Sequence, residues 1–216
     1  MLPAEGSEDS PSGRTYETGR IEAFSDGMFA IAMTLLVLDL KVPPVMDHGP
    51  RLLPLLLKQW PSYVAFLTSF AFIGIMWINH HRLFSLIQRS DHGLLLLNGL
   101  LLLGVTIIPF PTQLLATYVG HRDQNVAAMV YNGVYVFLAL FFNLLWRYAS
   151  HNNRLLDERA DPQSVRAITQ AYALGPLFYL ATFVISIFSV PVSLVANLLL
   201  AAFFALPERH QFKLTP

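Results

Sequence analysis

The segment from residue 20 to residue 44 is apolar and helical in pattern, but it is too short for a lipid-facing membrane crossing. Asp26 and Asp39 are separated by twelve uncharged residues. At about 1.5 Å per residue these reach roughly 18 Å, against a hydrocarbon core of about 30 Å. We therefore expect this helix to be enclosed by protein or to border a narrow axial passage. A short buried helix in a membrane bundle is the alternative.

Two stripes follow this helix at 3.6 residues per turn. The first consists of large apolar side chains: Phe24, Met28, Ile31, Leu35 and Leu38. The second consists of small side chains: Ala23, Gly27, Ala30 and Thr34. Small residues allow another helix to approach closely. The large stripe then needs a different partner, either the protein interior or the lining of a passage.

The rest of the chain has the composition of an integral membrane protein. Of its 216 residues, 54% are hydrophobic and 13% are charged, against about 25% charged in soluble domains. The net charge is zero, and no nucleic-acid-binding motif is present, so a nucleic-acid partner is not expected. Cysteine is absent, which excludes disulfides, thiol catalysis and thiolate metal sites.

Six apolar segments predict an all-α membrane domain over residues 19–207. They are residues 20–44, 61–79, 93–118, 126–146, 167–188 and 190–206. Prolines are expected to break the third segment at 109–112 and to kink the fifth at Pro176. The Pro-rich stretch 41–58 is expected to lie outside the membrane, with room for a short interfacial helix.

The two ends of the chain are predicted to be polar tails on the cytoplasmic side. Residues 1–18 lack the apolar core of a signal peptide and are expected to be disordered, and residues 208–216 form a second short tail. With six crossings, ten Lys and Arg residues fall on the side of the termini and four on the other. The positive-inside rule therefore places both termini in the cytoplasm of a multi-pass cell-membrane protein.

This topology brings polar residues from separate helices to one depth. Arg20, Ser25 and Asp26 should lie level with His80 and His81. Asn79, Asn98 and Asn143 belong to the same level. Because an unpaired polar group in hydrocarbon costs several kcal/mol, we expect a mutually satisfied network, with Arg20 neutralising Asp26. Anchoring of the two histidines at lipid headgroups is the alternative.

Metal binding and catalysis are not expected at this level. Adjacent histidines on a helix point about 100° apart, and no His or carboxylate follows at i+4. Ser25, Asp26 and a remote His match a catalytic triad in composition only, since no nucleophile elbow is present. We therefore expect neither a metal site nor an enzyme.

Several motifs resemble those of the transmembrane protein 175 potassium channels, in particular their short prokaryotic branch. The pattern R-x-x-x-F-S-D is filled by Arg20, Phe24, Ser25 and Asp26. The pattern W-x-x-H-H-x-L-F is filled from Trp77 onward and includes His80 and His81. Asn98 and the PFPT sequence at 109–112 match further features. The resemblance covers residues 20–206, and its first motif is specific.

This resemblance implies a six-helix subunit that assembles as a homotetramer around a pore lined by the first helices. The family's narrowest pore residue falls on Ile31, and Leu35 and Leu38 match further hydrophobic rings. Met28 stands where Val or Leu would be expected, and Thr34 flanks the stripe. The chain has one FSD motif and no TVGYG filter, so four chains would be needed.

We therefore predict a passive, potassium-preferring cation channel with membrane lipids as its surroundings. Transport is expected to be passive rather than pumped because no nucleotide-binding motif is present. Potassium is the permeant ion, and no cofactor is expected. The alternative is a proton-coupled secondary transporter that uses Asp26 and His80 as a coupled site and the broken third helix as its discontinuous element. No inverted repeat between the two halves supports that alternative.

Overall fold

The computed structural model describes residues 16–45 and 51–205. Its elements, in chain order, are β1 (Tyr16–Glu17), α1 (Gly19–Leu35), the 3₁₀ helix η1 (Leu36–Asp39), α2 (Leu52–Lys58), α3 (Trp60–Leu86), β2 (Arg89–Ser90), α4 (His92–Ile107), α5 (Pro109–Tyr118), α6 (Gln124–Ser150), η2 (His151–Asn153), α7 (Pro162–Phe188) and α8 (Val190–Ala205). The predicted tail 208–216 and the first fifteen residues of the predicted tail 1–18 lie outside the described residues.

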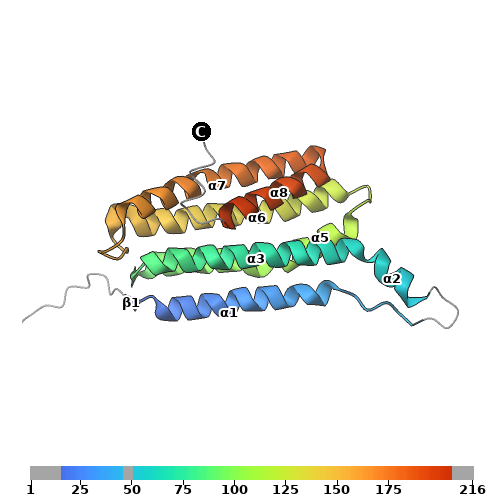
Figure 1. The fold of residues 1–216 in the computed structure, drawn as a ribbon, viewed down its shortest axis with the longest axis horizontal. Helices are drawn as coiled ribbons and strands as arrows, with labels where there is room; N and C mark the ends of the chain where they lie inside the picture. The colour runs from blue at the N-terminus through green and yellow to red at the C-terminus, as the bar shows by residue number, and fades with distance from the viewer. Residues whose placement is uncertain (1–15, 46–50, 206–216) are drawn as a thin grey trace, which may run out of the picture.

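The long helices form an elongated bundle with α1 along one edge (Figure 1). α1 packs against α3 and α4, whereas α6 packs against α4, α5 and α7. α8 lies against α7 and α3, so α7 and α8 cover the side of the bundle opposite α1 (Figure 1). The core contains large, fully buried side chains from α1, α3 and α6: Phe29, Phe84, Tyr131 and Trp146. α1 is thus held by the bundle from one side.

The predicted all-α membrane architecture is confirmed, with one difference in span length. Five helical segments of the described chain are long and apolar enough to cross a membrane: Gly19–Asp39, Trp60–Leu86, His92–Tyr118, Gln124–Asn153 and Pro162–Phe188. The sixth predicted segment corresponds to α8, a shorter apolar helix of 16 residues. At about 1.5 Å per residue it reaches roughly 24 Å.

Several helices extend beyond the predicted limits of the hydrocarbon core. The second segment was predicted over 61–79, whereas α3 continues to Leu86 and includes the whole WINHHRLF sequence. The connection between the predicted fourth and fifth segments is shorter than residues 147–166, because α6 continues to Ser150 and α7 begins at Pro162. Asp161 caps α7 by accepting hydrogen bonds from the amides of Gln163 and Ser164. A capped helix remains stable in the polar interface, so loss of hydropathy does not mark its end.

The predicted break in the third segment is confirmed and lies at Ile108. α4 ends at Ile107 and α5 begins at Pro109. The Ile108 amide bonds the Val105 carbonyl at 3.2 Å, a tighter turn than the α-helical pattern. Pro109 has no amide hydrogen to continue the ladder. By length and hydropathy the two helices together still form one apolar span, His92–Tyr118.

A small backbone ribbon joins three segments at the end of the bundle where α1 begins. β1 pairs antiparallel with β2, with Tyr16 opposite Ser90 and Glu17 opposite Arg89. Tyr16 and Glu17, at the end of the predicted tail 1–18, are held by this pairing. Next to the ribbon, Ile87 forms an antiparallel bridge with Leu156. The start of α1 is consequently tied to the α3–α4 and α6–α7 connections.

Gly104 allows α4 to lie close against α6. An added Cβ at Gly104 would come within 2.8 Å of Phe137 and Leu138 side-chain atoms, whereas one at Gly99 on the same helix would meet nothing within 4 Å. We expect Gly104→Ala to destabilise the fold by about 1–2 kcal/mol through overpacking. Gly99→Ala should be neutral or stabilising by up to about 1 kcal/mol, the helix-propensity gain. Thermal unfolding in detergent measures both. Equal melting temperatures in the two variants would contradict close packing at Gly104.

Candidate functional site

α1 has one face packed on the bundle and one face that its own subunit leaves uncovered. The packed face is formed by residues three or four positions apart: Ile21, Ser25, Phe29, Ala32 and Leu36. On the other face, Ile31 is 52% exposed and Leu38 is 65% exposed. Phe24 is 63% exposed, and Leu35 is 37% exposed. Four large apolar residues on one stripe thus lack a partner within the described subunit.

Met28 and the small stripe complete the description of this face. Met28 departs from the stripe because it is half-buried and packs against the core. Ala23, Gly27 and Ala30 are exposed, and a Cβ placed on Gly27 would meet nothing within 4 Å. Thr34 is exposed, and its hydroxyl donates to the Ile31 carbonyl at 2.8 Å. α1 therefore presents both stripes to whatever lies beside the subunit.

Three buried polar side chains connect α1, α3 and α4 at one depth. Asn98 Nδ2 donates to Ser25 Oγ at 3.0 Å, and Asn98 Oδ1 lies 2.9 Å from His80 Nε2. Ser25 Oγ in turn donates to the Ile21 carbonyl at 2.8 Å. A carbonyl oxygen can only accept, so His80 carries its proton on Nε2. These bonds join the three side chains in sequence, and the network fixes α1 against its neighbours.

Aromatic side chains enclose the His80 ring. Phe84 stacks on it with ring centroids 4.4 Å apart, and Phe29 meets it edge-on at 5.4 Å. His80 itself is 1% exposed. Headgroup anchoring, the alternative for the two histidines, does not describe this residue.

Asp26 belongs to a separate contact at the exposed side of α1. Trp77 Nε1 donates to Asp26 Oδ1 at 2.8 Å, and the His81 ring stacks on Trp77 with centroids 6.4 Å apart. The predicted Arg20–Asp26 ion pair is not among the ion pairs of the described residues, and Arg20 is exposed. The partner of the Asp26 carboxylate is therefore the Trp77 indole of α3, not the Arg20 guanidinium.

The other two asparagines predicted at this depth have different surroundings. Asn143 Nδ2 donates to the Tyr172 carbonyl, which joins α6 to α7. Asn79 lines a cavity of about 50 Å³ between α3, α6, α7 and α8. Neither residue contacts the Ser25 network, because each points away from α1.

A second buried network was not predicted. Ser69 Oγ lies 2.8 Å from Thr112 Oγ1 and 3.3 Å from the Tyr131 hydroxyl. The Tyr135 hydroxyl donates to Tyr131 at 3.1 Å. This chain links α3, α5 and α6 at the PFPT sequence. Hydroxyl residues inside apolar segments are its only sequence signal, and such residues commonly bond their own helix backbone instead.

Neither metal binding nor hydrolytic chemistry is supported by the site. Across residues 16–45 and 51–205, no group of three or more His, Asp or Glu side chains is placed to hold a metal ion. Ser25 Oγ donates to a backbone carbonyl, and its side-chain partner is an amide rather than a base. It is therefore not activated as a nucleophile.

Comparison with known proteins identifies related sequences. The model of a family described as the endosomal/lysosomal potassium channel TMEM175 matches residues 20–109. A potassium channel of Chamaesiphon minutus is 53% identical over 191 residues, covering 88% of this chain and 94% of the relative. A potassium channel of Streptomyces collinus is 47% identical over 189 residues, covering 87% of this chain and 91% of the relative.

A solved structure has the same arrangement of helices. The crystal structure of a lysosomal potassium-selective channel TMEM175 homolog from Chamaesiphon minutus superposes with a TM-score of 0.79. The two chains are 50% identical, and the match covers 88% of this chain and 97% of the other. The likeness includes nearly the whole of that chain.

The Ser25 network should contribute to the stability of the fold. Asn98→Ala leaves the His80 imidazole and the Ser25 hydroxyl without their shared partner, which should cost about 1–3 kcal/mol in the free energy of unfolding. Asn79→Ala is the matched control, since the Asn79 side chain forms no hydrogen bond among the described residues. Thermal unfolding in detergent compares the two variants. A loss as large in Asn79→Ala would show that the network adds no specific stability.

Proposed function

This chain belongs to the TMEM175 family of ion channels, and we propose that it conducts potassium ions passively through a pore lined by α1. Its relatives are potassium channels, not enzymes. The observation that carries the proposal is the uncovered apolar stripe of α1, on which Ile31 and Leu38 are more than half exposed. In a membrane protein, side chains left uncovered by the subunit face lipid, another subunit or a pore.

We propose a homotetramer because one chain supplies one pore-lining helix. In a ring of subunits related by rotation, one surface of each subunit contacts a different surface of its neighbour. The small stripe with Gly27 and Ala30 suits the close approach of a neighbouring helix. The large stripe, about a quarter of a turn away, then points toward the rotation axis. This arrangement gives both stripes a partner without any change in the subunit.

Three hydrophobic rings would follow one another along such a pore. Ile31 is the innermost, Leu35 lies one turn further out, and Leu38 belongs to the 3₁₀ helix η1. From Ile31 to Leu38 the rise is roughly 12 Å, at 1.5 Å per residue in α1 and 2.0 Å per residue in η1. Rings of apolar side chains offer an ion no replacement for its hydration shell and can gate by dewetting. The lower dehydration cost of the larger ion favours potassium over sodium.

Thr34 and Met28 would modify this pathway at its flanks. The Thr34 hydroxyl donates to the Ile31 carbonyl, so its lone pairs remain able to accept from water or to face a cation. Met28 packs partly into the subunit, so it narrows the inner side of the Ile31 ring less than a fully exposed residue would. We infer that Ile31 dominates the constriction.

The polar residues of the first motif would act on the pore indirectly. Ser25, His80 and Asn98 fix the rotation of α1 about its axis. Trp77 and Asp26 add a second attachment, flanked by His81. Arg20 and Phe24 are exposed near the start of α1. We propose that the buried groups set which side chains point toward the axis, and that none of them conducts ions.

We propose six crossings with both termini in the cytoplasm of a cell-membrane protein. α7 and α8 pack on each other and are joined at Ser189, as expected for two successive crossings in opposite directions. The excess of Lys and Arg on the side of the termini supports this orientation. Lipids would surround the outer helices, and neither a cofactor nor a nucleic acid is needed.

The transporter alternative has less support. It requires Asp26 and His80 to act as one proton site, but Asp26 bonds Trp77 whereas His80 bonds Asn98. No hydrogen bond joins the two residues within the described chain. Next to the break in the third span, Thr112 of α5 forms a hydrogen bond with Ser69 of α3, so the broken segment is held against α3.

Reconstitution in liposomes tests conduction and the assigned constriction. Ile31→Asn should wet the tightest ring and weaken the discrimination of potassium over sodium. If the barrier falls by about 1.4 kcal/mol, the current should rise about tenfold. The control is Ile187→Asn, the same change at a residue of α7 that is 41% exposed. A reversal potential and current unaltered by Ile31→Asn, or equally altered by Ile187→Asn, would reject the constriction.

Subunit assembly is tested by enlarging the small stripe. Ala30→Leu adds bulk to an exposed position of α1, and Ala181→Leu adds the same bulk to an exposed position of α7. If α1 helices meet along the small stripe, Ala30→Leu should convert most of the tetramer to smaller species, whereas Ala181→Leu should not. Light scattering of the detergent-purified protein gives the mass. Tetramer retained in Ala30→Leu would place the contact elsewhere.

A further inference from the structure

A basic pocket opens between α4 and α6, at the end of the bundle that carries the β1–β2 ribbon. It has a volume of about 460 Å³ and is lined by Leu97, Leu144, Arg147, Tyr148, His151 and Arg154. Two of these six residues are arginines, one is a histidine and two are leucines. The proposed pore does not use this pocket, which lies on helices away from the uncovered face of α1.

The pocket changes from apolar to cationic along the axis of α6. Leu144, Arg147, Tyr148 and His151 follow the i, i+3, i+4, i+7 pattern and so share one face of the last helical turns. Leu144 is 38% exposed on the membrane-spanning part. Arg147 and His151, one to two turns further, are exposed where the span ends. This gradient matches the polarity of a phospholipid that stands beside the helix.

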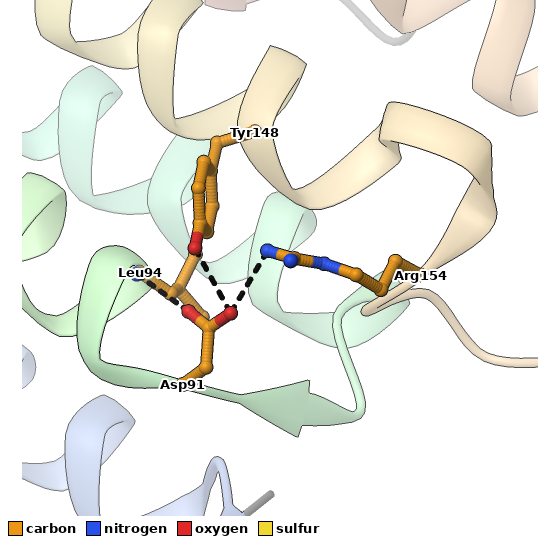
Figure 2. Close-up of polar contacts among 4 residues, drawn as sticks. All are labelled: Asp91, Leu94, Tyr148 and Arg154. Atoms are coloured by element: carbon orange, nitrogen blue, oxygen red, sulfur yellow. Dashed lines mark hydrogen bonds and ion pairs between the residues drawn. The ribbon is translucent and has the colours of Figure 1, made fainter. Parts of the chain in front are cut away.

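Arg154 is held in place by neighbouring side chains. Its guanidinium donates to Asp91 Oδ2 at 2.8 Å and lies over the Tyr148 ring, 4.8 Å from its centroid. The Tyr148 hydroxyl donates to the same carboxylate oxygen at 2.9 Å, and Asp91 Oδ1 accepts from the Leu94 amide (Figure 2). Asp91 therefore neutralises one of the two arginines and orients it, while also capping α4.

Arg147 has no such compensation. Among the described residues, the Arg147 side chain forms no hydrogen bond and no ion pair. Glu158, an acidic residue of the α6–α7 connection, pairs with Arg89 instead, at 2.7 Å. The pocket thus has two arginines and a histidine facing one carboxylate. The excess guanidinium stands near the end of the apolar span Gln124–Asn153.

We propose that this pocket binds an anionic phospholipid of the adjacent leaflet. The phosphate accepts hydrogen bonds from Arg147 and from the free nitrogens of Arg154, and an acyl chain lies along Leu97 and Leu144. Guanidinium groups suit phosphate oxygens because they offer several donors in one plane. The apolar half of the pocket distinguishes a lipid from a free phosphate ion. Binding of this lipid requires no conduction, so the proposal stands apart from the proposed function.

Lipid titration by native mass spectrometry tests this site on the delipidated full chain in detergent. Phosphatidylglycerol should bind more tightly than phosphatidylcholine. Arg147→Gln should weaken phosphatidylglycerol binding about fivefold, the contribution of one basic residue near an anionic membrane surface. Arg147→Lys keeps the charge and should retain most of the binding. Arg159→Gln is the control, because Arg159 is an exposed arginine of the connection that follows α6 and lies outside the pocket.

Several results would overturn the proposal. These are equal binding of phosphatidylglycerol and phosphatidylcholine, an equal loss of binding in Arg159→Gln, or unchanged binding in Arg147→Gln. Displacement of the lipid by millimolar inorganic phosphate would also overturn it, because the pocket would then take a free anion. Elution volume and melting temperature should match the unmodified protein in every variant, since the Arg147 side chain holds no structural contact.

Discussion

The hydrogen bonds between Ser25, Asn98 and His80 determine how the first helix is presented. They lie where water cannot replace a missing partner, so the three helices that supply them must keep one relative rotation. Phe29 and Phe84 close the site around the imidazole. Because Ser25 lies on the packed face of α1, Ile31 and Leu38 are turned away from the bundle. The polar network therefore decides which apolar residues remain uncovered.

In the proposed tetramer, the uncovered face of α1 would connect the fold of one subunit to a pore shared by several. A helix with roughly 18 Å of uncharged sequence is poorly matched to lipid. It is well matched to an axis where water enters from both ends and a short apolar constriction separates the two sides. A different part of the bundle, between α4 and α6, forms a pocket with a basic lining that includes Arg147 and Arg154. Conduction and lipid binding would thus use different faces.

Much of this architecture follows from hydropathy and periodicity. Long apolar segments separated by polar or Pro-rich sequence locate the helices, and Pro109 locates the break in the third span. Helix ends are less accurate. α3 runs to Leu86 and α7 starts at Pro162, because backbone hydrogen bonds and the Asp161 cap continue beyond the hydrocarbon. The pairing of β1 with β2 was missed, since two-residue strands leave no periodic pattern.

The sequence by itself predicted that Ser25, His80 and Asn98 share one level and that Ile31, Leu35 and Leu38 share one face of α1. Depth follows from counting residues along a helix, and facing follows from its fixed period, so Ser25, His80 and Asn98 could be placed at one level. Only the tertiary structure decided their partners. Asp26 bonds Trp77 rather than Arg20, and Asn143 bonds the Tyr172 backbone. Partner choice depends on the rotation of each helix about its axis and on the spacing between helices, which local sequence does not specify.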